Sequence, residues 1–263
     1  MTTILDKILD AKKVQVEQML LDSIADQHEI IARPSLFDAL YHSKRLQVIS
    51  EIKRASPSKG LIAEGIIPAD QASQYAKAGA ACISVLTDTP FFQGTFDDLA
   101  EVARTVSIPI LCKDFIIHPI QIDYAKQAGA SVVLLIVAAL EQEKLASLYD
   151  YAISRGLEVL VEVHDSVELD HALELDAKLI GVNNRDLRTF KVDLSRTAEI
   201  AAIFPFEEER VLISESGIWN SIDAMKVASY GASAVLVGES LMRSGDVGDA
   251  LQSLQVQKEV TIS

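Results

Sequence analysis

The sequence predicts a (β/α)8 barrel, and three observations support this fold class. Short apolar runs rich in β-branched residues recur eight times, at intervals of roughly 20 to 35 residues. Between them lie helical patterns, in which apolar residues return every three or four positions. Several of these patterns end in a glycine, as in Lys77-Ala-Gly-Ala80, where a helix is expected to stop. Eight strand–helix units in one chain suit a closed parallel barrel.

The predicted elements alternate along the chain from residue 46 onward. The expected strands are 47–52, 82–86, 109–113, 132–137, 158–163, 179–182, 211–214 and 234–238. The expected helices are 69–78, 96–105, 119–128, 141–154, 166–175, 195–203 and 221–230. An open doubly wound sheet, built from the same units, is the alternative architecture.

A helical extension within residues 1–45 precedes the first strand. Apolar residues recur at helical spacing over 3–20, and a second short helix is expected from Pro34, since Pro and Ser favour a helix start. Because this segment contributes no strand, we expect it to pack across one end of the barrel. No linker divides the remainder, so residues 1–263 are expected to form a single domain.

The composition limits the classes of partner. The 263 residues carry a formal net charge of −14, and 49% of them are hydrophobic. Binding to nucleic acid or to an anionic membrane surface is not expected, because both need a basic face. No apolar run reaches the roughly 18 residues of a membrane-spanning helix. The N-terminus lacks the apolar stretch of a signal peptide, and Cys82 and Cys112 lie in apolar runs, so we expect a cytoplasmic protein with buried thiols.

Acidic, basic and amide side chains gather at the carboxyl ends of the expected strands. Glu51 and Lys53 share one face of the first strand, although this pair alone could also be the solvated end of an edge strand. The other polar strand ends are Lys113, Glu162, Asn183, Glu215 and Ser216. In a barrel these ends converge on one face, where acids and bases shift each other's pKa values and exchange protons. Lys53, Lys113, Glu51 and Glu162 are expected to form one mixed cluster.

Small residues in the loops after the last two strands predict a phosphate site. The phrases Ser214-Glu-Ser-Gly217 and Val237-Gly-Glu-Ser240 allow backbone N–H groups to approach a ligand, and a short helix is expected near Ser240. Ser56 and Ser58, after the first strand, could add hydroxyl donors. The expected ligand is a small phosphorylated molecule.

Apolar side chains near the same strand ends predict contacts with a flat ring. Phe92 follows the second strand beside Phe91 in a Pro/Gly loop, Phe115 follows the third strand, and Leu134 lies on the fourth. Adjacent phenylalanines in such a loop are poorly placed for the core, whereas a planar aromatic substrate would give them a partner. Trp219 is expected only to pack at the start of a helix.

No metal ion or organic cofactor is expected. The five histidines are scattered, and the two cysteines lack the spacing of metal ligands. The chain contains neither a Walker sequence nor a dinucleotide-binding fingerprint.

Seven motifs occur at these strand ends, in order along the chain. They are Ile49-Ser-Glu-Ile-Lys-Arg-Ala-Ser-Pro-Ser58, Leu86-Thr-Asp with Phe92-Gln-Gly94, Ile110-Leu-Cys-Lys-Asp-Phe115, Leu160-Val-Glu-Val163, Gly181-Val-Asn-Asn-Arg-Asp-Leu187, Ser214-Glu-Ser-Gly217 and Val237-Gly-Glu-Ser-Leu-Met-Arg243. Together they resemble the indole-3-glycerol-phosphate synthase family, from the N-terminal helices to the last strand. The resemblance implies a (β/α)8 barrel with an N-terminal extension, and a cofactor-free carbon–carbon lyase of tryptophan biosynthesis.

The reaction that the resemblance implies closes 1-(2-carboxyphenylamino)-1-deoxyribulose 5-phosphate to indole-3-glycerol phosphate, with loss of CO2 and water. Lys113 would be the general acid that protonates the substrate carbonyl, and Glu162 the base or proton partner. Lys53 would hold the anthranilate carboxylate and donate a proton in the dehydration. The residues implied to orient the substrate and the lysines are Glu51, Asn183, Glu215 and Ser216.

The resemblance also implies binding residues. Those expected around the aromatic ring are Phe92, Phe115, Leu134 and Leu187, and Arg185 would tie down the neighbouring loop and touch substrate. Those expected around the phosphate are Ser56, Gly217, Gly238, Glu239 and Ser240.

Two residues depart from the family pattern. His118 stands where an acidic or other polar residue is common, and Glu239 stands where a small residue is also found. We expect the Glu239 side chain to point away from the phosphate, which it would otherwise repel. The loop Ser56-Pro-Ser-Lys-Gly60 is expected to act as a mobile flap over the pocket.

Two other functions fit parts of the pattern. A sugar-phosphate isomerase or aldolase would use the same phosphate site, but it leaves the aromatic residues and the Glu51–Lys53 pair without a clear role. A non-catalytic phosphate-binding subunit would not need four opposed charges at its mouth. The sequence leaves the division of acid and base roles open, and a monomer or a weak homo-oligomer is expected.

Overall fold

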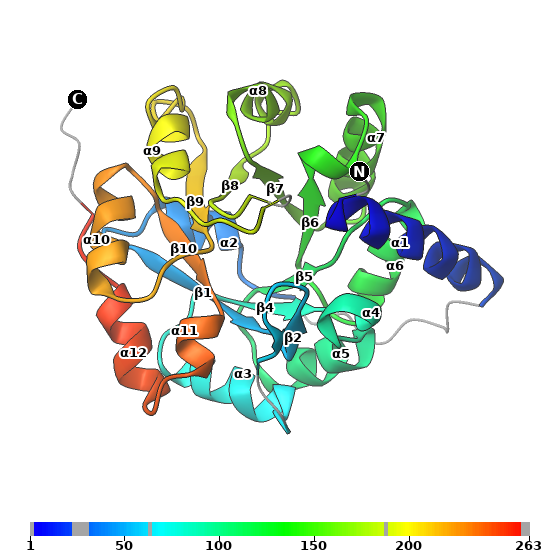
Figure 1. Ribbon diagram of the computed structural model, residues 1–263, viewed down its shortest axis with the longest axis horizontal. Helices are drawn as coiled ribbons and strands as arrows, with labels where there is room; N and C mark the ends of the chain where they lie inside the picture. The colour runs from blue at the N-terminus through cyan, green and yellow to red at the C-terminus, as the bar shows by residue number, and fades with distance from the viewer. Residues whose placement is uncertain (1–2, 23–31, 63–64, 187–188, 259–263) are drawn as a thin grey trace.

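Eight parallel strands close into a barrel in the computed structural model, which describes residues 3–22, 32–62, 65–186 and 189–258 (Figure 1). The strands are β1 (Gln47–Ile52), β4 (Cys82–Leu86), β5 (Ile110–Lys113), β6 (Val132–Ile136), β7 (Glu158–Val163), β8 (Leu179–Asn183), β9 (Val211–Glu215) and β10 (Ala234–Val237). The ring closes because β1 pairs in parallel with both β4 and β10. The predicted fold class is confirmed, and the open doubly wound sheet is wrong.

Both faces of the barrel strands are buried, which explains their nearly continuous apolar sequences. On β1, Val48 packs in the layer between the strands and the outer helices. Its neighbour Ile49 belongs to a separate interior cluster with Leu111 and Leu160. Glu51 has the same strand parity as Ile49, so it points inward at the carboxyl end of the barrel.

Helices surround the barrel (Figure 1). Those that follow strands and pack outside are α3 (Pro68–Lys77), α5 (Phe96–Thr105), α6 (Pro119–Gln127), α7 (Gln142–Ser154), α8 (Ser166–Glu174), α9 (Ser195–Ala201), α10 (Ser221–Ser229) and α12 (Val247–Leu254). Gly79, Gly129 and Gly231 follow three of them with φ of +93°, +95° and +99°, so the predicted stop signals are confirmed. His118 caps α6, because its Nδ1 accepts the Ile120 N–H at 3.1 Å. This departure from the family pattern therefore has a local structural role.

Short elements also occupy the loops at the mouth of the barrel. A hairpin of β2 (Ala55–Ser56) and β3 (Gly60–Leu61) follows β1, α4 (Thr89–Phe92) follows β4, and η1 (Val137–Ala139) follows β6. The expectation that Phe92 lies in an irregular loop is wrong, because Asp88 accepts the Phe91 N–H at 2.8 Å and caps a short helix. The helix expected near Ser240 is present as α11 (Glu239–Met242).

The two N-terminal helices lie at opposite ends of the barrel, so the expectation that this extension packs across one end is wrong. Lys12 of α1 (Ile4–Leu21) pairs with Asp88 and Asp114, which follow the carboxyl ends of β4 and β5. At the other end, Leu36 of α2 (Leu36–Tyr41) packs in the interior cluster. Its N–H donates at 2.7 Å to Glu158, the first residue of β7.

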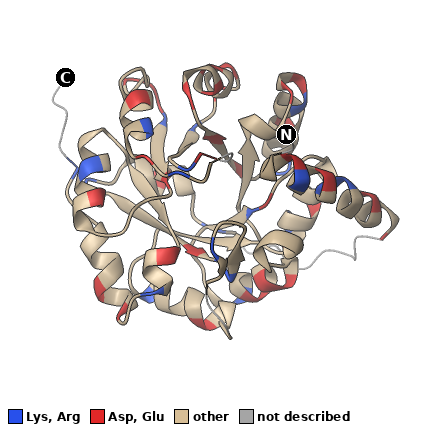
Figure 2. Cartoon of the chain, in the orientation of Figure 1, with Lys and Arg blue, Asp and Glu red and all other residues tan. Residues whose placement is uncertain are grey.

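Acidic residues are frequent on the outer helices. In the view of Figure 2, Asp and Glu are spread over helices on several sides of the barrel. Within the described part of the chain, no helix combines the length and the apolar character needed to cross a membrane.

Candidate active site

A cavity at the carboxyl ends of the strands gathers every predicted site residue that the structure describes. The predicted catalytic residues along it are Glu51, Lys53, Lys113, Glu162, Asn183, Glu215 and Ser216. The predicted binding residues along it are Ser56, Phe92, Phe115, Leu134, Arg185, Gly217, Gly238, Glu239 and Ser240. Leu187, the remaining predicted residue, lies outside the described residues.

Lys113 lies between two buried carboxylates. Its Nζ is 3.1 Å from Glu162 Oε2 and 3.2 Å from Glu215 Oε2. The Lys113 side chain is 13% exposed, and each glutamate side chain is 2% exposed. The three residues come from β5, β7 and β9, so the closure of the barrel brings them together.

Burial and mutual charge set the pKa values in this cluster. Burial raises the pKa of Glu215 to about 7, although Lys113 opposes the shift. Burial also disfavours ionised Glu162, but Lys113 and His164 outweigh it and lower the pKa of Glu162. Burial alone would lower the pKa of Lys113, whereas Glu162, Glu215 and Glu51 raise it above its ordinary value. At neutral pH Lys113 is therefore protonated and Glu162 is ionised, whereas Glu215 can gain or lose a proton.

Two glycines leave room for the carboxylates of the site. A Cβ on Gly181 of β8 would lie 2.2 Å from Glu215 Oε1, and a Cβ on Gly238 would lie 2.7 Å from Glu51 Oε1. Any side chain at either position would have to displace a charged group that lines the cavity.

Glu51 and Lys53 form a second ion pair, in direct hydrogen-bond contact. All four residues line one cavity, but Lys53 pairs with Glu51 whereas Lys113 pairs with Glu162. The prediction of one mixed cluster is therefore only partly confirmed. The interpretation of Glu51 and Lys53 as the solvated end of an edge strand is wrong. β1 has a neighbour on each side, and Glu51 is 5% exposed.

Asn183 connects Glu162 to the loop after β9. Its Nδ2 donates to Glu162 Oε1 at 3.1 Å, and its Oδ1 accepts from Ser216 Oγ at 3.0 Å. The Arg185 N–H donates to the same Oδ1 at 3.0 Å. The guanidinium of Arg185 donates to the Phe190 carbonyl at 3.4 Å, so this residue also holds the loop after β8.

Small residues form the corner of the cavity between β9 and α11. Ser216 and Gly217 both have left-handed backbones, with φ of +66° and +87°. The Glu239 carboxylate pairs with Arg243 at 3.0 Å, one turn further along the chain. This pairing gives the negative charge of Glu239 a partner outside the predicted phosphate contacts.

Apolar side chains form one wall of the cavity. The rings of Phe92 and Phe115 are 5.9 Å apart between centroids, and Leu134 is buried on β6. α1 adds three aliphatic side chains to the lining, Ile4, Leu5 and Ile8. The expectation that Trp219 only packs is wrong, because this residue lines the cavity and is 50% exposed.

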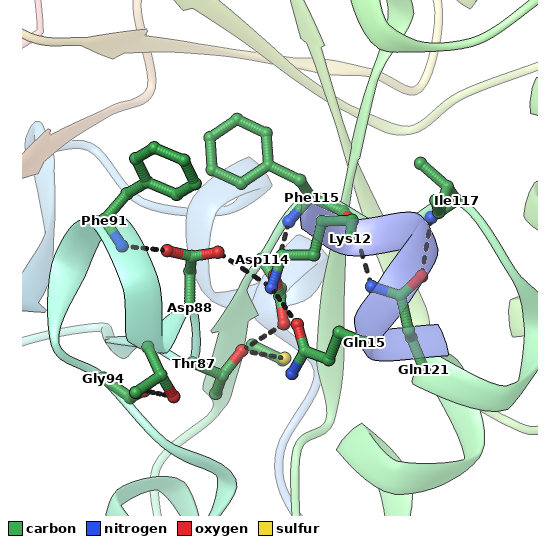
Figure 3. A network of polar contacts seen from close by, with 12 residues as sticks. Lys12, Gln15, Thr87, Asp88, Phe91, Gly94, Asp114, Phe115, Ile117 and Gln121 are labelled. Atoms are coloured by element: carbon green, nitrogen blue, oxygen red, sulfur yellow. Dashed lines mark hydrogen bonds and ion pairs between the residues drawn. The ribbon is translucent and has the colours of Figure 1, made fainter. Parts of the chain in front are cut away.

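A buried lysine holds α1 beside this wall (Figure 3). Lys12 Nζ lies 3.0 Å from Asp88 Oδ2 and 2.5 Å from Asp114 Oδ1, and none of these side chains is more than 1% exposed. Asp88 caps the helix that carries Phe92, and Asp114 directly precedes Phe115. The ion-paired network therefore connects α1 to both phenylalanines.

Sequence patterns do not identify the contribution of α1 to the site. Lys12 falls between Ile8 and Val16 in the apolar stripe of the helix, which is the available signal for a buried cation. Nothing local indicates its partners, Asp88 and Asp114, which lie in the segments after β4 and β5. His164, which faces Glu162, is likewise missed when histidines are considered only as metal ligands.

Solved structures with a similar fold include the 3-hexulose-6-phosphate synthase from Salmonella typhimurium. It superposes with a TM-score of 0.63 at 14% sequence identity, over 80% of this chain and 96% of that chain. A likeness at this identity shows the fold alone.

Sequence relatives carry more information. A protein of Oceanobacillus iheyensis named indole-3-glycerol phosphate synthase is 46% identical over 254 residues, or 97% of each chain. Another protein of that name, from Exiguobacterium sp. (strain ATCC BAA-1283 / AT1b), is 55% identical over 213 residues, covering 81% of this chain and 83% of the relative. The profile of the family described as indole-3-glycerol phosphate synthase matches residues 5–254. The chain therefore belongs to the indole-3-glycerol phosphate synthase family, whose members are carboxy-lyases of tryptophan biosynthesis.

Proposed function

We propose that the cavity closes 1-(2-carboxyphenylamino)-1-deoxyribulose 5-phosphate to indole-3-glycerol phosphate, with loss of CO2 and water. The observation that carries this proposal is the position of Lys113, a buried cation between Glu162 and Glu215 in a cavity that also contains Phe92 and Phe115. The reaction needs this combination, since an acid must reach a carbonyl while an aromatic ring is held beside it.

In the first step Lys113 acts as the general acid. The ring carbon that bears the carboxylate attacks the substrate carbonyl, and Lys113 gives a proton to the carbonyl oxygen, which becomes a hydroxyl. Loss of CO2 then returns the bonding electrons to the ring and restores its aromaticity. The raised pKa of Lys113, caused by Glu162, Glu215 and Glu51 against the effect of burial, keeps it protonated until the substrate arrives.

In the second step water is lost. Lys53 first holds the substrate carboxylate and then protonates the leaving hydroxyl, while Glu162 serves as the base or proton partner. The residues that orient the substrate and the two lysines are Glu51, Asn183, Glu215 and Ser216. Two observations support these orienting roles: the ion pair of Lys53 with Glu51, and the hydrogen bonds of Asn183 with Glu162 and Ser216.

Substrate binding uses two parts of the cavity. Backbone N–H groups near Gly217, Gly238 and Ser240 receive the phosphate, with Ser56 as a hydroxyl donor and Glu239 held aside by Arg243. The residues proposed to enclose the ring are Phe92, Phe115 and Leu134, with Leu187 as a further predicted contact. Arg185 orders the adjoining loop and touches substrate.

The test is direct conversion of the open-chain substrate by the purified protein, followed through the fluorescence of the indole product. Appearance of indole-3-glycerol phosphate, with one CO2 released per product, is the expected result. A lysine adduct trapped by borohydride without indole formation would instead support an aldolase. Binding of the phosphorylated substrate without turnover would support a non-catalytic barrel.

Other parts of the function stay predictions. The proposed steps use only side-chain acids and bases, so we expect full activity without an added cofactor. A cytoplasmic location, a monomer or weak homo-oligomer, and a mobile flap at Ser56-Pro-Ser-Lys-Gly60 are likewise expected.

A further inference from the structure

The part of the cavity that follows β9 and β10 is lined without lysine or arginine. It consists of residues 216–219 and 236–240, all of them described, and we call it the phosphate corner. Its one charged side chain, Glu239, pairs with Arg243 at 3.0 Å. A phosphate monoester carries a charge of about −1.5 to −2 at pH 7, so neutral donors must hold it in this corner. This inference rests on the proposed function, which places the substrate phosphate there.

The serine hydroxyls of the phosphate corner already have acceptors. Ser216 Oγ donates to Asn183 Oδ1 at 3.0 Å, and Ser240 Oγ donates to the Ile218 carbonyl at 3.0 Å. Each hydroxyl has a single hydrogen to donate. A phosphate could therefore receive either hydrogen only if an existing hydrogen bond were broken.

Trp219 carries the remaining side-chain donor of the phosphate corner. The residue lines the cavity and is 50% exposed, and its indole N–H has no acceptor among the described residues. An indole N–H donates but does not accept, so it suits an anion. Of the described side chains in this corner, Trp219 therefore has the donor that is free for a ligand.

The backbone around Trp219 is held in place from both sides. Its N–H donates to Asp223 Oδ2 of α10 at 2.9 Å, and the preceding Ile218 carbonyl accepts the bond from Ser240 of α11. Asn220 caps α10, because its Oδ1 accepts the Asp223 N–H at 3.1 Å. The indole is thus attached to a fixed segment beside α11, and little backbone order has to be gained when a ligand binds.

We propose that Trp219 binds the substrate phosphate: its indole N–H donates to a phosphate oxygen, and its ring covers the phosphate from solvent. A hydrogen bond to an anion is stronger than one between neutral groups, and exclusion of water strengthens it further. The phosphate takes no part in bond making, so this contact is the same in the bound substrate and in the transition state. Trp219 should therefore lower KM without changing kcat.

Intrinsic fluorescence tests the contact without any substitution. The chain contains a single tryptophan, so the emission of the wild-type protein reports on Trp219 alone. The probe is glycerol 3-phosphate, which has a phosphate but no aromatic ring. Its binding should shift the emission to shorter wavelength and reduce quenching by acrylamide, whereas glycerol should change neither. An unchanged emission at saturating glycerol 3-phosphate would overturn the proposal.

Two substitutions separate the N–H from the ring. Trp219→Phe keeps a ring without the donor, and calorimetry should show the Kd for glycerol 3-phosphate rising about fivefold. Trp219→Ala removes the cover as well, and the Kd should rise at least about tenfold. KM for the open-chain substrate should rise in parallel, with kcat within about twofold of wild type. The matched control is Ile222→Ala, at a 69% exposed position on α10 outside the cavity, which should leave all these values unaltered.

Three results would contradict the proposal. Wild-type affinity in Trp219→Phe would overturn the hydrogen bond, and wild-type affinity in both variants would overturn the contact altogether. A fall in kcat with KM unchanged would place Trp219 beside the reacting groups instead. Failure of the proposed function is distinguishable, because wild type would then form no indole product, whereas fluorescence and calorimetry with glycerol 3-phosphate need no turnover.

Discussion

Glu215 illustrates how one buried residue links catalysis to stability. It faces Lys113 at 3.2 Å, yet burial raises its pKa from 4.5 to about 7. The folded protein therefore binds this proton more tightly than the unfolded chain does. The stabilisation is fully present below pH 4.5 and is lost as the pH rises through 7.

This linkage predicts that Glu215→Gln gains stability relative to wild type as the pH rises. Between pH 5 and pH 8 the difference in free energy of unfolding should move in favour of the variant by about 2–3 kcal/mol, because glutamine cannot ionise. Urea denaturation across this range measures the change. Glu143→Gln, at an exposed position on α7, is the matched control and should show no such trend. A difference for Glu215→Gln that does not vary with pH would contradict the assignment.

At the scale of single residues, the sequence predicts where a charged side chain lies better than it predicts which partner that side chain contacts. Strand parity places Lys113, Glu162 and Glu215 at one face of the barrel, and the structure agrees. Strand parity does not reveal that Glu51 pairs with Lys53. Nor does it reveal that Lys113 pairs with Glu162 and Glu215. These choices depend on strand register around the closed ring, which a local pattern does not contain.

The helix α1 is the element whose position follows least directly from its own sequence. Its amphipathic pattern predicts a helix over 3–20, and the observed bounds are Ile4–Leu21. Its apolar stripe fits either end of a barrel equally well. The pairing of Lys12 with Asp88 and Asp114 determines at which end of the barrel α1 packs. Both aspartates lie far from α1 in the sequence, in other strand–helix units.

Removal of this buried cation should therefore loosen α1. Lys12→Met would leave two carboxylates buried without a cation, and we expect the free energy of unfolding to fall by about 3–5 kcal/mol. KM for the substrate should rise, since the network connects α1 to Phe92 and Phe115. Urea denaturation and steady-state kinetics measure the two effects.

The neighbouring Lys13→Met is the matched control. Lys13 is 67% exposed and pairs with Asp10 on the surface, so its loss should cost less than about 1 kcal/mol. If both variants had the same small effect on stability, the anchoring role of Lys12 would be wrong.

In the whole molecule, the two ends of the barrel differ in chemical character. At the amino ends of the strands, Leu36 and Leu40 of α2 pack in the apolar interior cluster and close the barrel. The opposite end carries the ion pairs, the left-handed loop at Ser216 and the glycines that leave space for carboxylates. This division is common to barrels, in which the carboxyl ends of the strands provide the active site.

Regular repetition explains why the overall architecture is predictable. Apolar runs recur in each unit and C′ glycines in several of them, so the eight strands and most of the outer helices can be recognised from the sequence, whereas α12 is not predicted. The short helix α4 and the hairpin β2–β3 have no period to detect, because single hydrogen bonds and turns define them. They lie at the mouth, which is why the binding surface is less predictable than the barrel.

Turnover by Lys113→Met tests whether Lys113 is the general acid of the ring closure. Conversion of the open-chain substrate would be followed through indole fluorescence, and binding of glycerol 3-phosphate would be measured on the same protein. We predict that kcat falls at least about 100-fold while glycerol 3-phosphate still binds, because the proton donor is lost and the phosphate contacts remain. The surface change Lys144→Met should leave both unaltered. Wild-type turnover in Lys113→Met would contradict the role of Lys113 as the proton donor.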